Sequence, residues 1–300
     1  MTVAQKHARR VTAGRRATTT ICLIALLAGC STTRLVVRTT QPLLEKSVEA
    51  MNRETDLELA RAAIPANLKM LDGMIAADPG NAALHLMMAE GLYGYAFAFV
   101  EPTDRARASA LYRRCHEHAS RALLALGLKA DPRKADRTAL ERAVAQAGER
   151  QLPGLFWAAA CLAKHVDMNR DDPRALSRMA RAVIMMQRVL ALDPGYYHAG
   201  PHLFFAVYYG SRPPMLGGDL TRSARHFDKA RELTDGRLLM VDVLQAEFLD
   251  RQNNDREAFH RHLMHVLRTP VGTWPELAFA NQVARRRARD LLLKESAWFD

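Results

Sequence analysis

The sequence predicts an all-α protein built from stacked antiparallel helix hairpins. Its apolar residues recur at steps of three and four, the spacing of one face of an α-helix. No segment sustains the alternation of apolar and polar residues that is typical of a strand, and clusters of Val, Ile and Thr are few. Short turns containing an Asp-Pro pair separate the helical runs, at residues 78–81, 131–132 and 193–195.

Four sets of apolar residues carry the helical period. The sets are Ile64, Leu68, Leu71 and Ile75; Leu176, Met179, Val183, Met186 and Leu190; Phe259, Leu263 and Val266; and Leu277, Ala280, Ala284, Ala288 and Leu291. Because residues three and four apart lie on one side of a helix, each set is expected to face the core.

One pattern occurs twice along the chain, over residues 68–99 and 183–209. An apolar helix with small residues on its face is followed by an Asp-Pro turn and an aromatic-rich helix. Ala and Gly at close crossings, with short turns between helices, favour tetratricopeptide-like (TPR-like) hairpins. The period is irregular, so the repeats are degenerate. No linker or change of composition divides residues 43–300, which are therefore expected to form one helical domain.

The first 29 residues have the pattern of a secretory signal. Basic residues precede a short apolar run over residues 21–29, about half the length that a spanning helix needs. Residues 27–30, Leu-Ala-Gly-Cys, resemble the lipobox of bacterial lipoproteins. This resemblance implies cleavage before Cys30, acylation of its sulfur and, with Ser31 next, sorting to the outer membrane. Residues 30–42 are then a lipidated Cys and a tether without helical period; an ordinary signal with a chance Cys is the alternative.

The net charge of +11 does not indicate nucleic-acid binding. Five of the basic residues lie in the signal segment, so the rest of the chain carries an excess of only about +6. No separate basic tail is present, and we expect no nucleic-acid partner. The arginines at 285–287 and 289 are interpreted as a solvated helix face, some of which could meet an acidic partner or a carboxylate solute.

The sequence offers no catalytic or metal-binding constellation, and we expect no cofactor. His262 and His265 can share a helix face, but no third ligand has a matching spacing. There is no nucleophile elbow, phosphate-binding Gly-Lys loop or dinucleotide fingerprint. Cys115 and Cys161 are either buried thiols or, in an oxidising periplasm, a disulfide. An interaction protein is therefore favoured over an enzyme, with an envelope hydrolase as the less favoured alternative.

Aromatic residues gather on more than one face of the predicted helices, which favours either complete burial or the lining of a cavity. The candidate lining residues are Tyr93, Tyr95, Phe97, Phe99, Trp157, Tyr208 and Tyr209. Core packing and an apolar pocket both remain open at this point.

The segment after Tyr209 is a candidate loop for contact with a ligand or partner. Its residues are Arg212, Pro213, Pro214, Gly217, Gly218 and Asp219. The proline pair stops a helix, the glycines allow unusual backbone angles, and Asp219 can cap the helix that follows. A plain helix-to-helix connection explains the same residues.

Taken with residues 190–197, this segment resembles the T-component (TatT) family of TRAP transporters. The resemblance covers residues 43–299 and implies a TPR-like, periplasm-facing lipoprotein that assists a TRAP uptake system. It implies a solute-binding P component as partner, a homo-trimer, and a cavity through each subunit. We expect the protein to dock this component and to hold or pass a small hydrophobic or carboxylate ligand. The resemblance transfers no catalytic residues. A TPR-like lipoprotein of an envelope assembly complex is the alternative.

Overall fold

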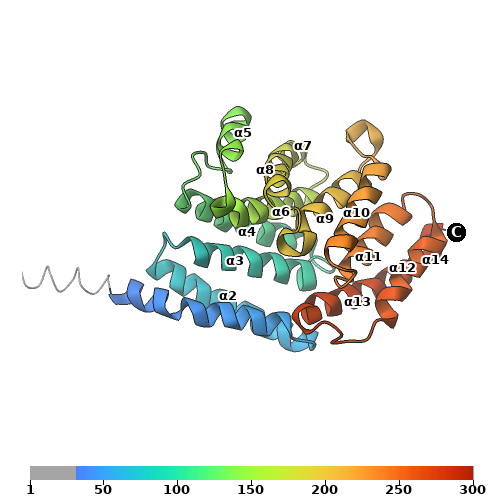
Figure 1. Cartoon of the computed structure of the whole chain (residues 1–300), viewed down its shortest axis with the longest axis horizontal. Helices are drawn as coiled ribbons and strands as arrows, with labels where there is room; N and C mark the ends of the chain where they lie inside the picture. The colour runs from blue at the N-terminus through green and yellow to red at the C-terminus, as the bar shows by residue number, and fades with distance from the viewer. Residues whose placement is uncertain (1–31, 300) are drawn as a thin grey trace, which may run out of the picture.

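Residues 32–299 are described by a computed structural model, and within that range the chain is helical with no β-strand (Figure 1). The predicted fold class is confirmed. The signal segment and Cys30 lie outside the described residues. After a helix over residues 32–52, the α-helices are α2 (Leu57–Ala77), α3 (Ala82–Tyr95), α4 (Arg105–Ala125), α5 (Arg137–Ala145), α6 (Leu152–Met168), α7 (Pro173–Leu176), α8 (Met179–Leu192), α9 (Tyr196–Gly210), α10 (Leu220–Leu233), α11 (Met240–Gln245), α12 (Arg256–Arg268), α13 (Ala278–Leu292) and α14 (Glu295–Phe299).

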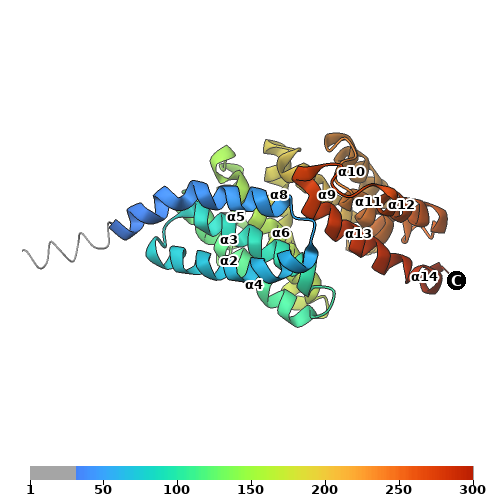
Figure 2. The ribbon, with the colours of Figure 1, turned by 90° about the horizontal axis from the view of Figure 1, so that it is seen from below.

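Neighbouring helices pack as hairpins in a continuous stack. Helices α2, α3, α4, α6 and α8 follow one another in space, and the α9–α10 and α12–α13 pairs continue the stack (Figures 1 and 2). Helix α5 is inserted between α4 and α6 and packs against α8. The Asp-Pro turns have the expected role, because the chain reverses direction between α2 and α3 and again between α8 and α9.

Two of the hairpins share a π-helical widening. Helix α3 continues into η1 (Ala96–Val100) and helix α11 into η4 (Ala246–Asp250), and both segments are π-helical. In each, the following amide donates to the carbonyl five residues back, with N–O distances of 2.8 Å for η1 and 3.1 Å for η4. Each is followed by a turn and a helix whose N-cap is an aspartate. Segment η1 lies at the end of the first copy of the pattern predicted at residues 68–99, whereas η4 lies beyond the second copy at residues 183–209.

The helix over residues 32–52 differs from the tether expected at residues 30–42. Val37, Leu44 and Met51 are seven residues apart and therefore lie on one helix face, which packs against the core. Thr39 and Thr40 donate their hydroxyls to helix carbonyls instead of breaking the helix. The Thr- and Arg-rich composition hid this stripe, since only one of its three members lies before residue 43.

Three of the four apolar stripes face the core as predicted, and the set at residues 176–190 does so except at Leu176. Leu176 is 45% exposed, whereas the fully buried residues of α8 are Ala182, Met185, Met186 and Val189. The chain breaks between α7 and α8, so a single helical period cannot run across residues 176–179. Of the predicted set, Met186 is fully buried, and Met179, Val183 and Leu190 are partly buried against the core.

Cys115 of α4 and Cys161 of α6 form a disulfide, with their Cα atoms 5.8 Å apart. Both residues are fully buried. The question that the sequence left open is thus answered in favour of the pair, which links two neighbouring helices of the stack.

Two glycines provide a stability test of the packing. A Cβ on Gly210 would lie 2.4 Å from the backbone oxygen of Phe248, whereas a Cβ on Gly73 would meet nothing within 4 Å. We predict that Gly210→Ala lowers the free energy of unfolding by about 1–3 kcal/mol through overpacking. Gly73→Ala, inside α2, should raise it by about 0.5–1 kcal/mol. Urea denaturation measures both; equal stability of the two variants would contradict the α9–η4 contact.

Candidate ligand-binding cavity

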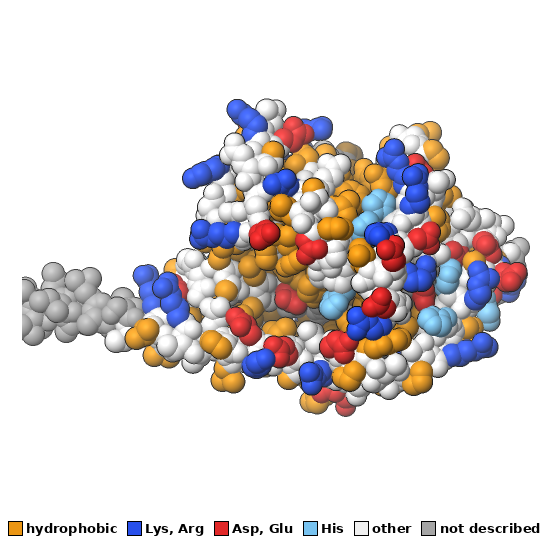
Figure 3. All heavy atoms as spheres, in the orientation of Figure 1, with side chains coloured by type: hydrophobic (Ala, Val, Ile, Leu, Met, Phe, Trp, Pro, Cys, Tyr) orange, Lys and Arg blue, Asp and Glu red, His pale blue; other side chains and the backbone are white. Residues whose placement is uncertain are grey.

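A cavity of about 430 Å³ lies within the helical stack. Its wall takes residues from the 32–52 helix and from α2, α3, α6, α8, α9, α11 and α13. The face drawn in Figure 3 is hollowed near its centre, where hydrophobic side chains gather. The volume is within the range of pockets that enclose small organic molecules.

Helix α3 contributes much of this wall. Together with η1 it forms a run, Ala82–Val100, that is long and apolar enough by length and composition to cross a membrane. Half of that run is buried inside the fold, between α2 and α4. Its apolar surface is therefore used by the core and the cavity.

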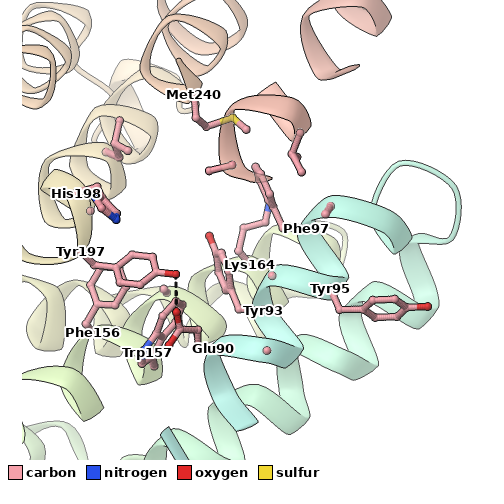
Figure 4. Close-up of a pocket in the computed structure, with 18 of the residues that line it drawn as sticks. Glu90, Tyr93, Tyr95, Phe97, Phe156, Trp157, Lys164, Tyr197, His198 and Met240 are labelled. Atoms are coloured by element: carbon pink, nitrogen blue, oxygen red, sulfur yellow. Dashed lines mark hydrogen bonds between the residues drawn. The ribbon is translucent and has the colours of Figure 1, made fainter. Parts of the chain in front are cut away.

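Four of the seven candidate aromatic residues line the cavity, namely Tyr93, Phe97, Trp157 and Tyr208. Tyr95 borders the cavity, but Figure 4 shows its ring directed away. Phe99 and Tyr209 do not line it. The choice between core and cavity thus differs from residue to residue.

The helical period explains the two residues that do not line the cavity. Phe99 lies two residues after Phe97 and therefore on another face, where its ring packs 6.2 Å from that of Phe279. Tyr209 directly follows Tyr208 and stacks instead on His226, at 5.8 Å between ring centroids. Sequence alone could not choose among adjacent aromatic residues.

Glu90 and Tyr197 form the polar contact in the aromatic part of the wall (Figure 4). The Tyr197 hydroxyl donates to Oε1 of Glu90 at 2.9 Å. Burial raises the pKa of Glu90, and the hydrogen bond from Tyr197 only partly offsets this rise. Burial also raises the pKa of Tyr197 well above its usual range. Both side chains are enclosed by protein but border the cavity, which accounts for the 41% exposure of Tyr197.

The backbone that carries Tyr197 is in an unusual conformation. Tyr197, His198 and Ala199 have φ angles of 46°, 57° and 58°, so three consecutive non-glycine residues are left-handed. Each such residue costs roughly 1–3 kcal/mol unless its surroundings hold it. Gly200 allows close packing here, because a Cβ on it would lie 2.6 Å from the Phe156 ring. The turn directs the rings of Tyr197 and His198 toward the cavity (Figure 4).

Two of the cations on the wall are already paired. Lys164 binds Glu101 at 2.7 Å, and Arg287 binds Glu247 at 3.1 Å and Glu101 at 3.7 Å. Burial alone would raise the pKa of Glu101, but Lys164 and Arg287 outweigh it and the pKa is lowered. These side chains therefore form a network in which each buried charge has a partner of opposite sign.

The arginines of α13 are not the solvated face expected from the sequence. Arg285 donates to carbonyl oxygens at the end of α12, and Arg286 lies over the Phe99 ring at 5.1 Å. Arg287 belongs to the charge network of the cavity wall. Of these four arginines, only Arg289 is exposed, and the other three are partly buried. Because residues 285–287 lie between α12 and the cavity, their guanidinium groups contact other parts of the protein instead of solvent alone.

Arg212 is the one candidate loop residue that lines the cavity. Its guanidinium stacks over the Tyr208 ring at 4.1 Å and donates to the Tyr208 carbonyl at 2.8 Å. Burial lowers its pKa. Within residues 32–299 no carboxylate lies within ion-pair distance of it, in contrast to Lys164 and Arg287.

The other loop residues hold the loop and do not line the cavity. Gly217 is left-handed with φ 85°, and a Cβ on Gly218 would lie 1.8 Å from the Arg212 carbonyl oxygen. Asp219 caps α10 by accepting from the Arg222 amide, and Pro213 and Pro214 lead into the short η3 (Pro214–Leu216). The interpretation as an ordered connection therefore describes these five residues.

Several lining residues escaped the sequence analysis. Glu90 is the only acidic residue in the apolar run of residues 82–100, and that isolation was a usable signal. Lys164 and Met240 stand in ordinary amphipathic patterns and give none. Tyr197 follows the Asp-Pro-Gly turn, but nothing in the sequence announces a left-handed run.

Polar clusters away from the cavity serve packing. Among the described residues, no three or more His, Cys, Asp or Glu side chains group as metal ligands. His262 and His265 instead contact Asp250 at 2.6 Å and Asp242 at 2.7 Å.

The described residues thus form a helical stack around a largely apolar cavity, with a few polar groups directed inward. The model of the TRAP transporter T-component family matches residues 53–299, and the chain belongs to that family. The resemblance noted from the sequence is thereby confirmed. The chain is also similar to a protein of Treponema pallidum (strain Nichols) described as uncharacterized, at 21% identity over 294 residues that cover 88% of this chain and 91% of that protein.

The raised pKa of Glu90 gives a pH-dependent prediction. A carboxyl that is easier to protonate in the folded state stabilises the fold below its ordinary value of 4.5 and loses that contribution as pH rises through the raised pKa. Glu90→Gln keeps an acceptor for Tyr197 without the charge. Its melting temperature should therefore exceed that of the unaltered protein by a margin that grows from pH 4.5 to 8.

The matched control is Glu149→Gln, which changes an exposed glutamate outside the cavity. It should melt like the unaltered protein at every pH. If the gain in melting temperature of Glu90→Gln stays constant or shrinks with rising pH, the raised pKa of Glu90 is contradicted.

Proposed function

We propose that this protein is the lipid-anchored, periplasm-facing accessory component of a TRAP-type uptake system. In this role it docks the solute-binding P component and holds a small ligand in its cavity. Membership of the T-component family supports the transport role. The cavity supports the ligand-holding role, since its wall is mostly apolar and aromatic.

The observation that carries the ligand's chemistry is the difference between the cations of the wall. Lys164 and Arg287 have carboxylate partners at 2.7 and 3.1 Å, so an anionic ligand would have to compete with these partners. Arg212 has its guanidinium fixed on the Tyr208 ring but has no carboxylate partner in the described part of the chain. A planar guanidinium binds a carboxylate with two parallel hydrogen bonds. The ligand we propose has an apolar body and one carboxylate end at Arg212.

The compartment follows from the family and the anchor. A TRAP transporter component works in the cell envelope. The buried Cys115–Cys161 disulfide is consistent with an oxidising compartment such as the periplasm. Acylation of Cys30 and sorting to the outer membrane belong to the proposal, as does a homo-trimer of the kind that the family resemblance implies.

A pair of probes tests the role of Arg212. Octanoate and octanol share an apolar body and differ in the carboxylate. We predict that the protein binds octanoate more tightly than octanol, by about tenfold or more for a charge-assisted contact. Arg212→Gln should remove most of this preference. Calorimetry measures both affinities. Octanol affinity should not change.

Arg222→Gln is the control for this test. Arg222 is near the same loop and lies over the Tyr209 ring at 5.5 Å, but it does not line the cavity. It should leave both affinities unchanged. Equal binding of the two probes by the unaltered protein would exclude the carboxylate end, and absence of binding by both would argue against a ligand site.

The anchor is tested by cell fractionation. We predict that Cys30→Ala releases the exported protein from the membrane fraction, because acyl chains supply the binding free energy of the anchor. The mature protein is detected by an antibody to a carboxy-terminal tag. An exported Cys30→Ala protein that stays with the membrane would contradict lipid anchoring at this residue.

A further inference from the structure

The helix over residues 32–52 has an apolar face that the fold does not cover. Its inner face, with Val37, Leu44 and Met51, packs against the core. On the outside, Leu35, Val36 and Leu43 are 63%, 59% and 69% exposed. Large apolar side chains gathered at such exposure mark a contact surface.

The two faces lie on different sides of the helix. At 100° per residue, Leu35, Val36 and Leu43 lie within an arc of about 100°, whose centre is about 120° from that of the inner stripe. The helix runs along the outside of the stack, and its first turns lie at one end of the molecule (blue in Figures 1 and 2). The outer face is therefore accessible to a broad, flat partner.

The first turns of this helix are positive, whereas its later turns carry charges of both signs. Residues 32–44 contain Arg34 and Arg38 and no acidic residue, and Glu45, Lys46 and Glu49 follow. Arg38 also binds Asp78 at 2.9 Å while its own side chain remains 65% exposed. This ion pair fixes the helix on the turn between α2 and α3. Apolar residues flanked by arginines suit the interface of a membrane with anionic headgroups.

We propose that the outer face, formed by Leu35, Val36 and Leu43, rests on the surface of the lipid bilayer. This proposal depends on the lipid anchor at Cys30 that is proposed above. Leu35 is five residues after Cys30, a reach of at most roughly 17 Å, so an anchor at Cys30 keeps the helix at the bilayer surface. Amphipathic helices bury their apolar face about 5–10 Å into this boundary.

This contact would orient the cavity with respect to the membrane. Leu44, Val48 and Met51 of the same helix line the cavity. One face of the helix is thus placed on lipid while another face forms part of the cavity wall. The anchor would then act as a positioning device in addition to a tether.

The test uses the lipidated protein in vesicles of phosphatidylethanolamine and phosphatidylglycerol. An environment-sensitive dye is attached to Leu43→Cys and, in a second variant, to Val36→Cys. The control is Leu293→Cys, since Leu293 is 84% exposed near the other end of the chain. Lipids carrying a nitroxide should quench most of the fluorescence at positions 36 and 43 and leave position 293 unquenched. Circular dichroism confirms that each labelled variant is folded.

Two readouts separate the face from the anchor. Failure of the protein to float with the vesicles contradicts the anchor and, with it, this proposal. Flotation with equal quenching at positions 43 and 293 contradicts the membrane contact alone. If the dye at position 43 instead becomes shielded as protein concentration rises without vesicles, a second copy of the chain covers the face and the proposal is overturned.

Discussion

Arg287 connects the two widened hairpins of the stack. It binds Glu101, the residue that follows η1, and Glu247 within η4, while Lys164 holds Glu101 from the side of α6. The side chain of Arg287 is only 20% exposed. Pairing of desolvated charges adds little net stability, but removal of one partner costs about 3–5 kcal/mol because the others stay buried. The network therefore fixes how α13 lies against α3 and α6, and this placement forms the cavity.

Both π segments contribute to the cavity wall, with Phe97 and Ala98 from η1 and Phe248 from η4. A π-helical turn is wider than an α-helical turn and often occurs at functional sites. Here both π segments lie beside the charge network, at Glu101 and at Glu247. The left-handed turn at Tyr197 adds a second departure from ideal geometry, on the opposite wall. Strain at a cavity wall is expected where a binding surface is held in one shape.

The sequence was sufficient for the fold because that information is local. Steps of three and four placed Leu68 and Leu263 in the core, and Asp-Pro pairs marked the turns. Family membership also followed from short segments, at residues 190–197 and 212–219. The exception was residues 32–42, where a stripe of period seven has too few members before residue 43 to be recognised.

The site was only partly predictable because it depends on contacts between distant residues. Tyr93 and Trp157 were identified from composition, yet Phe99 and Tyr209 differ from their cavity-lining neighbours only in helix face. Arg287 was assigned to a solvated run because its partners are 40 and more residues away. Pairing between such residues is fixed by tertiary structure and has no local pattern.

The proposed function depends most on the cavity being a ligand site, and one glycine allows a direct test. Gly94 lines the cavity, and a Cβ there would meet nothing within 4 Å. Gly94→Leu should therefore fill space without lowering stability, since the glycine is replaced inside a helix. Gly73→Leu, in similarly open space on α2 but not on the cavity wall, is the matched control.

The measurement is octanoate affinity by calorimetry together with the melting temperature of each variant. If the cavity is a ligand site, both leucine variants have a melting temperature at or above that of the unaltered protein, and only Gly94→Leu loses octanoate binding. Octanoate bound equally well by Gly94→Leu and Gly73→Leu would contradict a ligand site in the cavity.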